Sequence, residues 1–66
     1  MNIMYFKDTD TALLEFSDRP VDETREISQD VYVDLDKDGH VVSITIEHAA
    51  KLTALPHVTV QEIDAA

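Results

Sequence analysis

The sequence predicts an α+β fold that is mainly β: an antiparallel sheet of about four to six strands built from β-hairpins, with one short helix near residues 48–55. Three observations predict it. Apolar and polar residues alternate along 31–35 and 41–47, which is the period of a strand with one buried face. Asp38-Gly39 between these runs is typical of a tight hairpin turn. A segment rich in Ala and Leu then ends at Pro56.

The first hairpin is predicted over residues 2–6 and 11–16, around the polar loop 7–10. Pairing across this loop gives one apolar face. Its expected cross-strand pairs are Ile3 with Leu14 and Tyr5 with Ala12. The opposite face carries Met4, Phe6 and Leu13, and an apolar cluster on the outer face of a sheet is usually covered. We expect either the helix or a second subunit to cover it.

The second hairpin is predicted to turn through a two-residue type I′ turn at Asp38-Gly39, because both central residues of that turn need positive φ. The register that follows puts apolar residues opposite one another. The expected pairs are Leu35 with Val42, Val33 with Ile44 and Val31 with Ile46. Between the hairpins, residues 23–28 are polar and predict a short charged edge strand.

After the second hairpin, the spacing of Ala49, Leu52 and Leu55 predicts the helix. So short a helix is marginal in water, so we expect both leucines to dock on the sheet or on a partner. The tail 57–63 alternates well enough to predict a last strand, either at a sheet edge or as an arm exchanged between subunits.

Length and composition set the class of protein. The 66 residues predict one small domain over 1–66, and so small a core favours a homodimer. With no cysteine, no apparent signal peptide and no long apolar run, we expect a cytoplasmic protein without disulfides. Fourteen acidic residues against five basic ones give a formal charge of -9. This charge argues against nucleic acid and membranes as partners and is compatible with a small basic protein.

Candidate chemistry centres on Asp34, Asp36 and Asp38, whose alternate spacing before Gly39 matches the first half of a calcium loop. The twelfth position, where a bidentate Glu would close the site, is Thr45. The three aspartates are therefore weak candidates for a divalent cation. Asp34 and Asp36 are also candidates for an acid/base pair, but exposed carboxylates on a strand do little chemistry. We predict no catalytic residue and no cofactor.

Several short segments of residues 1–51 form a set. They are Ile3-Met4-Tyr5, Asp10 with Leu13-Leu14, residues 23–26, residues 33–39, Val41-Val42 with Ile44, and Ala49 with Lys51. Together they resemble the motifs of the domain of unknown function 2283 family of small prokaryotic proteins. The resemblance implies a compact β-rich fold with a terminal helix and no reaction. It also implies an antitoxin-like or other binding role, because the genes of family members often look like neighbours of genes for small basic toxin-like proteins.

The chain departs from the family pattern at four positions. Asp30 and Ser43 stand where Gly is common, Thr45 stands where Glu is common, and His48 replaces an acidic residue. If the acidic positions of the family served a metal or a ligand, this chain has lost two of them. We therefore do not carry such a site over to this sequence.

The function predicted from the sequence is a non-catalytic protein-interaction module, with an antitoxin-like role toward a small basic protein as its finer form. The residues predicted to make the interactions are Met4, Phe6, Leu13, Leu52 and Leu55. The alternative is a small metal-binding, ligand-binding or enzymatic domain that uses Asp34 and Asp36, with Glu47 or His48.

Overall fold

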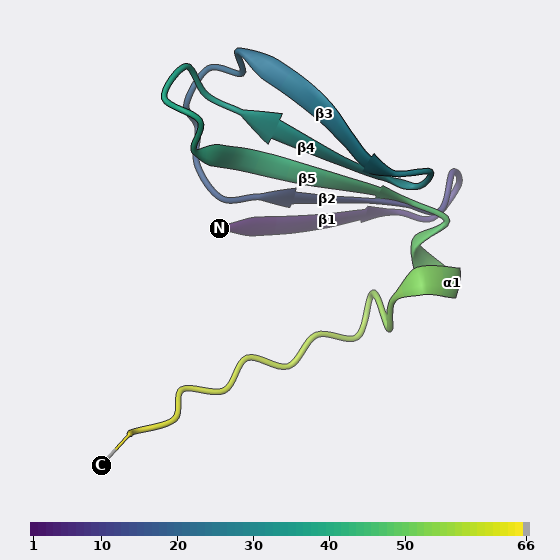
Figure 1. Cartoon of the computed structure of the whole chain (residues 1–66). Helices are drawn as coiled ribbons and strands as arrows, with labels where there is room; N and C mark the ends of the chain where they lie inside the picture. Colours follow the sequence, from purple (N-terminus) through teal and green to yellow (C-terminus); the bar gives the residue numbers. More distant parts are fainter. Residues whose placement is uncertain (66) are drawn as a thin grey trace.

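The computed structural model describes residues 1–65, in which five strands form one antiparallel sheet and a short helix follows the last strand (Figure 1). The elements are β1 (Asn2–Phe6), β2 (Thr11–Glu15), β3 (Glu23–Ser28), β4 (Val31–Leu35), β5 (Val41–Glu47) and α1 (Ala49–Leu52). Their order across the sheet is β1-β2-β5-β4-β3, so β5 lies at the centre and β3 at an edge. The predicted class, mainly β with one short helix near the C-terminus, is confirmed.

The first hairpin has the predicted register. Ile3 lies opposite Leu14 and Tyr5 opposite Ala12. β2 then pairs with β5, so that the same face continues from Leu14 to Ile44 in the central strand. Residues far apart in the sequence thus form continuous rows across the sheet.

The second hairpin has the predicted register over most of its length, since Val33 pairs with Ile44 and Val31 with Ile46. The pairing of Leu35 with Val42 was wrong, because the register shifts between Asp34 and Leu35 and brings Leu35 opposite Val41. Such a shift places two residues of one strand against one of the other, which is the geometry of a β-bulge.

The turn of this hairpin also differs from the predicted type I′ turn. Gly39 has φ +83°, but Asp38 is not among the residues with positive φ. The Gly39 N–H donates to the Asp36 carbonyl at 3.0 Å, and the Asp36 N–H donates to the His40 carbonyl at 2.9 Å. This is a three-residue loop in which a left-handed glycine follows a tight turn. Aspartate at the first position and glycine at the fourth are typical of a type I turn.

The helix is shorter than the predicted span of 48–55. Thr53 ends α1 in an extended conformation, and its hydroxyl donates to the Ala49 carbonyl at 2.7 Å, so the side chain competes with the helical backbone. Leu55 precedes Pro56, and the proline ring disfavours a helical conformation at the preceding residue.

The tail was predicted as a last strand over 57–63, and this was wrong: the structure assigns no strand within 57–65. Figure 1 shows the tail leaving α1 and running apart from the sheet. Its apolar side chains are open to solvent, with Val60 89% and Ile63 80% exposed. Alternation in the sequence supplied the pattern of a strand, but no neighbouring strand pairs with it in the described chain.

The core is very small. The buried apolar residues among 1–65 are Ala12, Leu35, Val42 and Ala49. Extensive contacts between elements join neighbouring strands only, so no second layer packs along the sheet in the described chain. Residues 1–65 also include no helix that is both long and apolar enough to cross a membrane.

Candidate functional site

One side of the sheet, here named the apolar face, is made by two rows of residues and their neighbours. The first row crosses from β1 to β4 and consists of Ile3, Leu14, Ile44 and Val33. The second row consists of Tyr5, Ala12, Ile46 and Val31. None of these eight residues is charged. The first charged pair lies on edge strand β3, where Arg25 donates to Glu23 at 2.8 Å.

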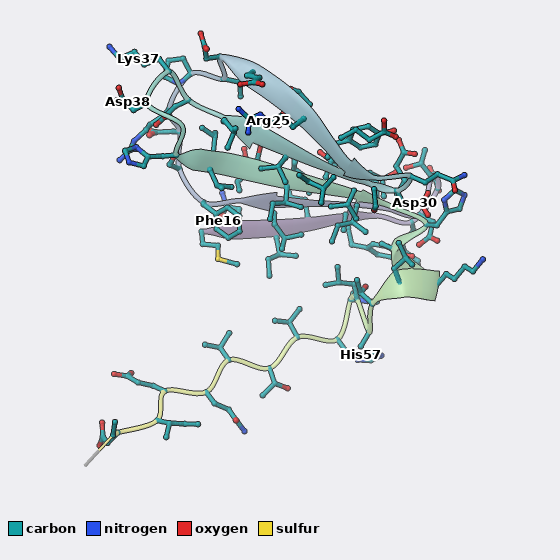
Figure 2. All side chains as sticks on the ribbon, in the orientation of Figure 1. Phe16, Arg25, Asp30, Lys37, Asp38 and His57 are labelled. Carbon is teal, nitrogen blue, oxygen red and sulfur yellow. The ribbon has the colours of Figure 1, made fainter. Side chains whose placement is uncertain are left out.

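The apolar face is only partly shielded from solvent. Leu14, Ile44 and Val33 lie in the middle of the first row, and each remains partly exposed. Ile3 is 37% exposed, and Phe16, which follows β2, is 41% exposed. Figure 2 shows Phe16 at the end of the sheet opposite α1. A row of large aliphatic side chains with no covering layer is an unusually apolar surface for a single chain.

The other side of the sheet, here named the acidic face, carries carboxylates on four strands. These are Glu15 on β2, Glu26 on β3, Asp34 on β4 and Glu47 on β5. The strand residues in the same rows include no Lys, Arg or His. Tyr32 also lies on this face, and the negative charges of Glu47 and Glu26 raise the pKa of its phenol.

A polar ladder crosses the acidic face from β3 to β5. Thr24 and Ser43 both donate to the Asp34 carboxylate, at 2.5 and 2.7 Å, from the strands on either side of β4. Each hydroxyl donates to a different oxygen of Asp34. Both oxygens therefore already accept hydrogen bonds, and the cross-strand bonds tie β3, β4 and β5 together.

The predicted interaction residues separate into two groups. Met4 and Leu13 are cross-strand partners on the acidic face, and Phe6 lies further along β1 on the same side, 49% exposed. Within residues 1–65 no helix covers this cluster. Leu52 is 51% exposed and does not dock on the sheet, whereas Leu55 is partly buried. Whether these residues contact a partner stays a prediction.

Asp10 holds the start of α1 against the first hairpin. Its carboxylate accepts the Tyr5 hydroxyl at 2.6 Å and the Ala50 N–H at 2.9 Å, and its backbone carbonyl accepts the Ala49 N–H at 2.9 Å. These bonds lower the pKa of Asp10 and raise that of Tyr5. Asp10 and His48 both have φ 54°, so the backbone bends sharply on both sides of this contact.

The sequence did not indicate this role for Asp10, because the contact joins positions forty residues apart. Since Tyr5 belongs to the apolar face, the contact places the start of α1 at the end of that face. At the same end, the His48 ring nitrogen Nδ1 lies 2.9 Å from the Asp30 carboxylate, and Figure 2 shows Asp30 at the end opposite Lys37 and Asp38.

Asp36 organises the turn between β4 and β5. It is only 6% exposed, and its Oδ1 accepts the N–H groups of Asp38 and His40, each at 2.9 Å. Its Oδ2 accepts an Arg19 N–H at 2.9 Å from the loop before β3. The His40 N–H, followed by the Arg19 guanidinium, lowers the pKa of Asp36 to about 2. The Asp-x-x-Gly spacing signalled such a turn, whereas nothing in the sequence pointed to Arg19.

Ligand atoms of Asp36, Asp38 and His40 lie within 4.8 Å of one another, which is the one grouping near the predicted cation site. Both oxygens of Asp36 already accept hydrogen bonds, and a cation there would have to displace Arg19. Asp34 lies on the acidic face with its own partners, so the structure does not bring Asp34 and Asp36 together in one site. The depression beside this turn has a volume of about 370 Å³, and Arg19 and Asp36 are both among its lining residues.

The architecture is a single antiparallel sheet with one face apolar and one face acidic, tied to a short helix through Asp10. Residues 2–49 match the family described as "Protein of unknown function (DUF2283)", and the chain belongs to this family. Neither the curated proteins nor the solved structures contain a significant match to the chain.

Proposed function

We propose that this protein is a non-catalytic protein-interaction module that binds a small basic protein through its acidic face. One observation carries the proposal: a cluster of apolar side chains on β1 and β2 lies beside the carboxylates of Glu15 and Glu47 on an open sheet surface. Met4 and Leu13 are partly exposed and Phe6 is 49% exposed. An apolar centre with a polar rim is the usual anatomy of a protein interface.

The charge of the rim supports a basic partner. Glu15 pairs with Ser43, which donates to Asp34, and Glu47 lies in the same row as Phe6 and Thr11. The formal charge of -9 extends this preference to the whole chain and accelerates encounter with a cationic protein. An antitoxin-like role, in which the acidic face neutralises a basic protein, is the finer form of the proposal.

The contacts of the aspartates weigh against the alternative of a metal-binding or enzymatic domain. The carboxylate oxygens of Asp34 accept hydrogen bonds from Thr24 and Ser43. Those of Asp36 accept hydrogen bonds from N–H groups of the turn and from Arg19. The hydrogen bonds from the His40 N–H and Arg19 lower the pKa of Asp36, so this carboxylate is a poor proton donor near neutral pH. The remaining acidic groups serve better as an electrostatic rim than as a reactive pair.

The test uses the full chain, tagged, expressed in its native host and purified at moderate salt, with copurifying proteins identified by mass spectrometry. We expect one basic protein in stoichiometric amount, released by raised salt because rim charges are screened. The variant Glu15→Lys with Glu47→Lys should lose the partner. Its matched control, Asp18→Lys with Asp64→Lys, changes the net charge equally at exposed positions off the sheet and should keep the partner.

Two results would contradict the proposal. One is a preparation in which no basic protein copurifies at any salt concentration. The other is a partner that both double variants retain equally, because binding would then not involve the acidic face.

A further inference from the structure

The described chain exposes more surface than a compact monomer of its size. Its accessible surface is 5293 Å², whereas a folded monomer of 7.4 kDa exposes about 4,200 Å². The radius of gyration is 13.3 Å, against about 11 Å for a compact chain of this length. The excess of about 1,100 Å² is comparable to the roughly 800 Å² that each partner buries in a standard protein interface.

Two parts of the chain contribute apolar area to this excess: the apolar face and the tail. Leu14, Ile44 and Val33 remain partly exposed in the middle of the face. Val60 and Ile63 in the tail are 89% and 80% exposed. The tail follows α1, and α1 starts at the end of the apolar face through the bond of Asp10 to Tyr5. Figure 1 shows the tail running on beyond α1 without joining the sheet.

Charge decides what covers this face. Two copies that each carry a formal charge of -9 repel one another, and they can approach closely only where no acidic group is buried between them. The acidic face fails this condition, because Glu15, Glu47 and Asp34 would meet their own copies. The apolar face satisfies the condition, because its two rows carry no charge. Glu23 at their edge is already paired with Arg25.

We propose that the apolar face is the interface between two copies of this chain, packed face to face as a two-layer β-sandwich with two-fold symmetry. Two sheets pack about 10 Å apart, and their aliphatic rows interdigitate into a core that one copy lacks. The tail of each protomer, from His57 to Val60, lies against the partner and adds Val58 and Val60, which precede the acidic residues Glu62 and Asp64, to the interface. The self-contact and the proposed basic partner then use opposite faces of the sheet.

The test is sedimentation equilibrium of the untagged full chain. We expect a mass of about twice 7.4 kDa, with a thermal midpoint that rises with protein concentration because unfolding is coupled to dissociation. A monomer whose midpoint is independent of concentration would overturn the proposal. So would a tail folded back over its own sheet, since that arrangement also yields a monomer.

Two neighbouring substitutions locate the interface. Ile44→Glu places a charge in the middle of the apolar face and should weaken dimerisation by about 100-fold or more, or leave the chain unfolded. Thr45→Glu makes the same substitution one residue later, on the acidic face, and should leave a folded dimer. A dimer that survives Ile44→Glu but dissociates with Thr45→Glu would place the interface on the wrong side and overturn the proposal.

The contribution of the tail has its own variant. Replacing Val58 and Val60 together by Ser should weaken the dimer by about 10-fold, since two exposed apolar side chains would lose their partner surface. Replacing Thr59 and Gln61 by Ser should change it little. If the two tail variants weakened dimerisation equally, the tail would not be part of the interface. Dimerisation through the apolar face does not depend on a basic partner. A negative result for the dimer therefore leaves the proposed function to be tested by copurification.

Discussion

The two faces of this sheet share one backbone and differ in the charge and polarity of the rows that cross them. Leu13 and Leu14 are neighbours in β2, and both are partly exposed in the single chain. Leu14 continues a row of aliphatic residues across β5 and β4, whereas Leu13 lies in a row with Thr45 and Tyr32. The comparison teaches that solvent exposure alone does not separate a core residue from a surface residue in so thin a protein. The chemistry of the row decides which role each residue has.

The largest expected effect separates these two leucines. Leu14→Ala should lower the free energy of unfolding by about 2–4 kcal/mol, because it removes packed methyl groups from the core that the proposed dimer completes. Leu13→Ala should cost about 1 kcal/mol or less. Urea denaturation of both variants at the same protein concentration measures the difference. Equal losses for both variants would contradict the distinction between the faces.

A smaller effect is expected at Gly39, whose turn supports both faces equally. Gly39→Ala should cost about 1–2 kcal/mol, because φ +83° strains any residue with a Cβ, although the space around it is open. Gly39→Asn should cost less, since Asn tolerates this conformation better. Thermal unfolding of the three proteins gives the order. A Gly39→Ala variant as stable as the parent would show that the turn can take another conformation.

The acid dependence of stability reports on Asp36. Its folded pKa of about 2 lies below the ordinary value of 3.8 for an aspartate, so the stabilising contribution is present above about pH 4 and disappears as the pH falls toward 2. Asp36→Asn should flatten that part of the stability profile. Denaturation at a series of pH values tests this, with Asp18→Asn at an exposed position as the control. A profile unchanged by Asp36→Asn would contradict the stabilising role assigned to the bonds of this carboxylate with the His40 N–H and Arg19.

The smallest effect concerns the tyrosines, one on each face. The pKa of Tyr32 is raised by Glu47 and Glu26, whereas that of Tyr5 is raised first by its hydrogen bond to Asp10. Glu47→Gln should therefore lower the pKa of Tyr32 toward 10.0, and added salt should do the same. The pKa of Tyr5 should change little. Ultraviolet titration of variants that keep one tyrosine each resolves the two groups.

Much of the sheet could be predicted because its signals are local. Alternation placed Ile3 opposite Leu14 and Val33 opposite Ile44, and both pairs occur in the structure. The turn type was wrong because Asp36 accepts two backbone N–H groups and shifts the loop by one residue. A type I turn beginning at Asp36 was readable from the sequence, but the Asp38-Gly39 dipeptide favoured the shorter turn.

The site was harder to predict because its parts are distant in the sequence. The contact of Asp10 with Ala50 and that of Arg19 with Asp36 depend on the folded topology, and no periodicity reports them. The tail carries the alternation of a strand without a neighbouring strand, so pattern alone predicted an element that the described chain does not form. Whether the predicted cluster of Met4, Phe6 and Leu13 binds a partner depends on a second molecule.

The most direct test of the central claim is nuclear magnetic resonance of the full chain with a soluble paramagnetic agent. The agent broadens methyl signals according to their access to solvent. We predict that the methyl groups of Ile44 and Val33 are protected, although both are partly exposed in the single chain, while those of Leu13 and Thr45 are broadened. Equal broadening on the two faces would contradict the account, because the apolar face would then be open to water.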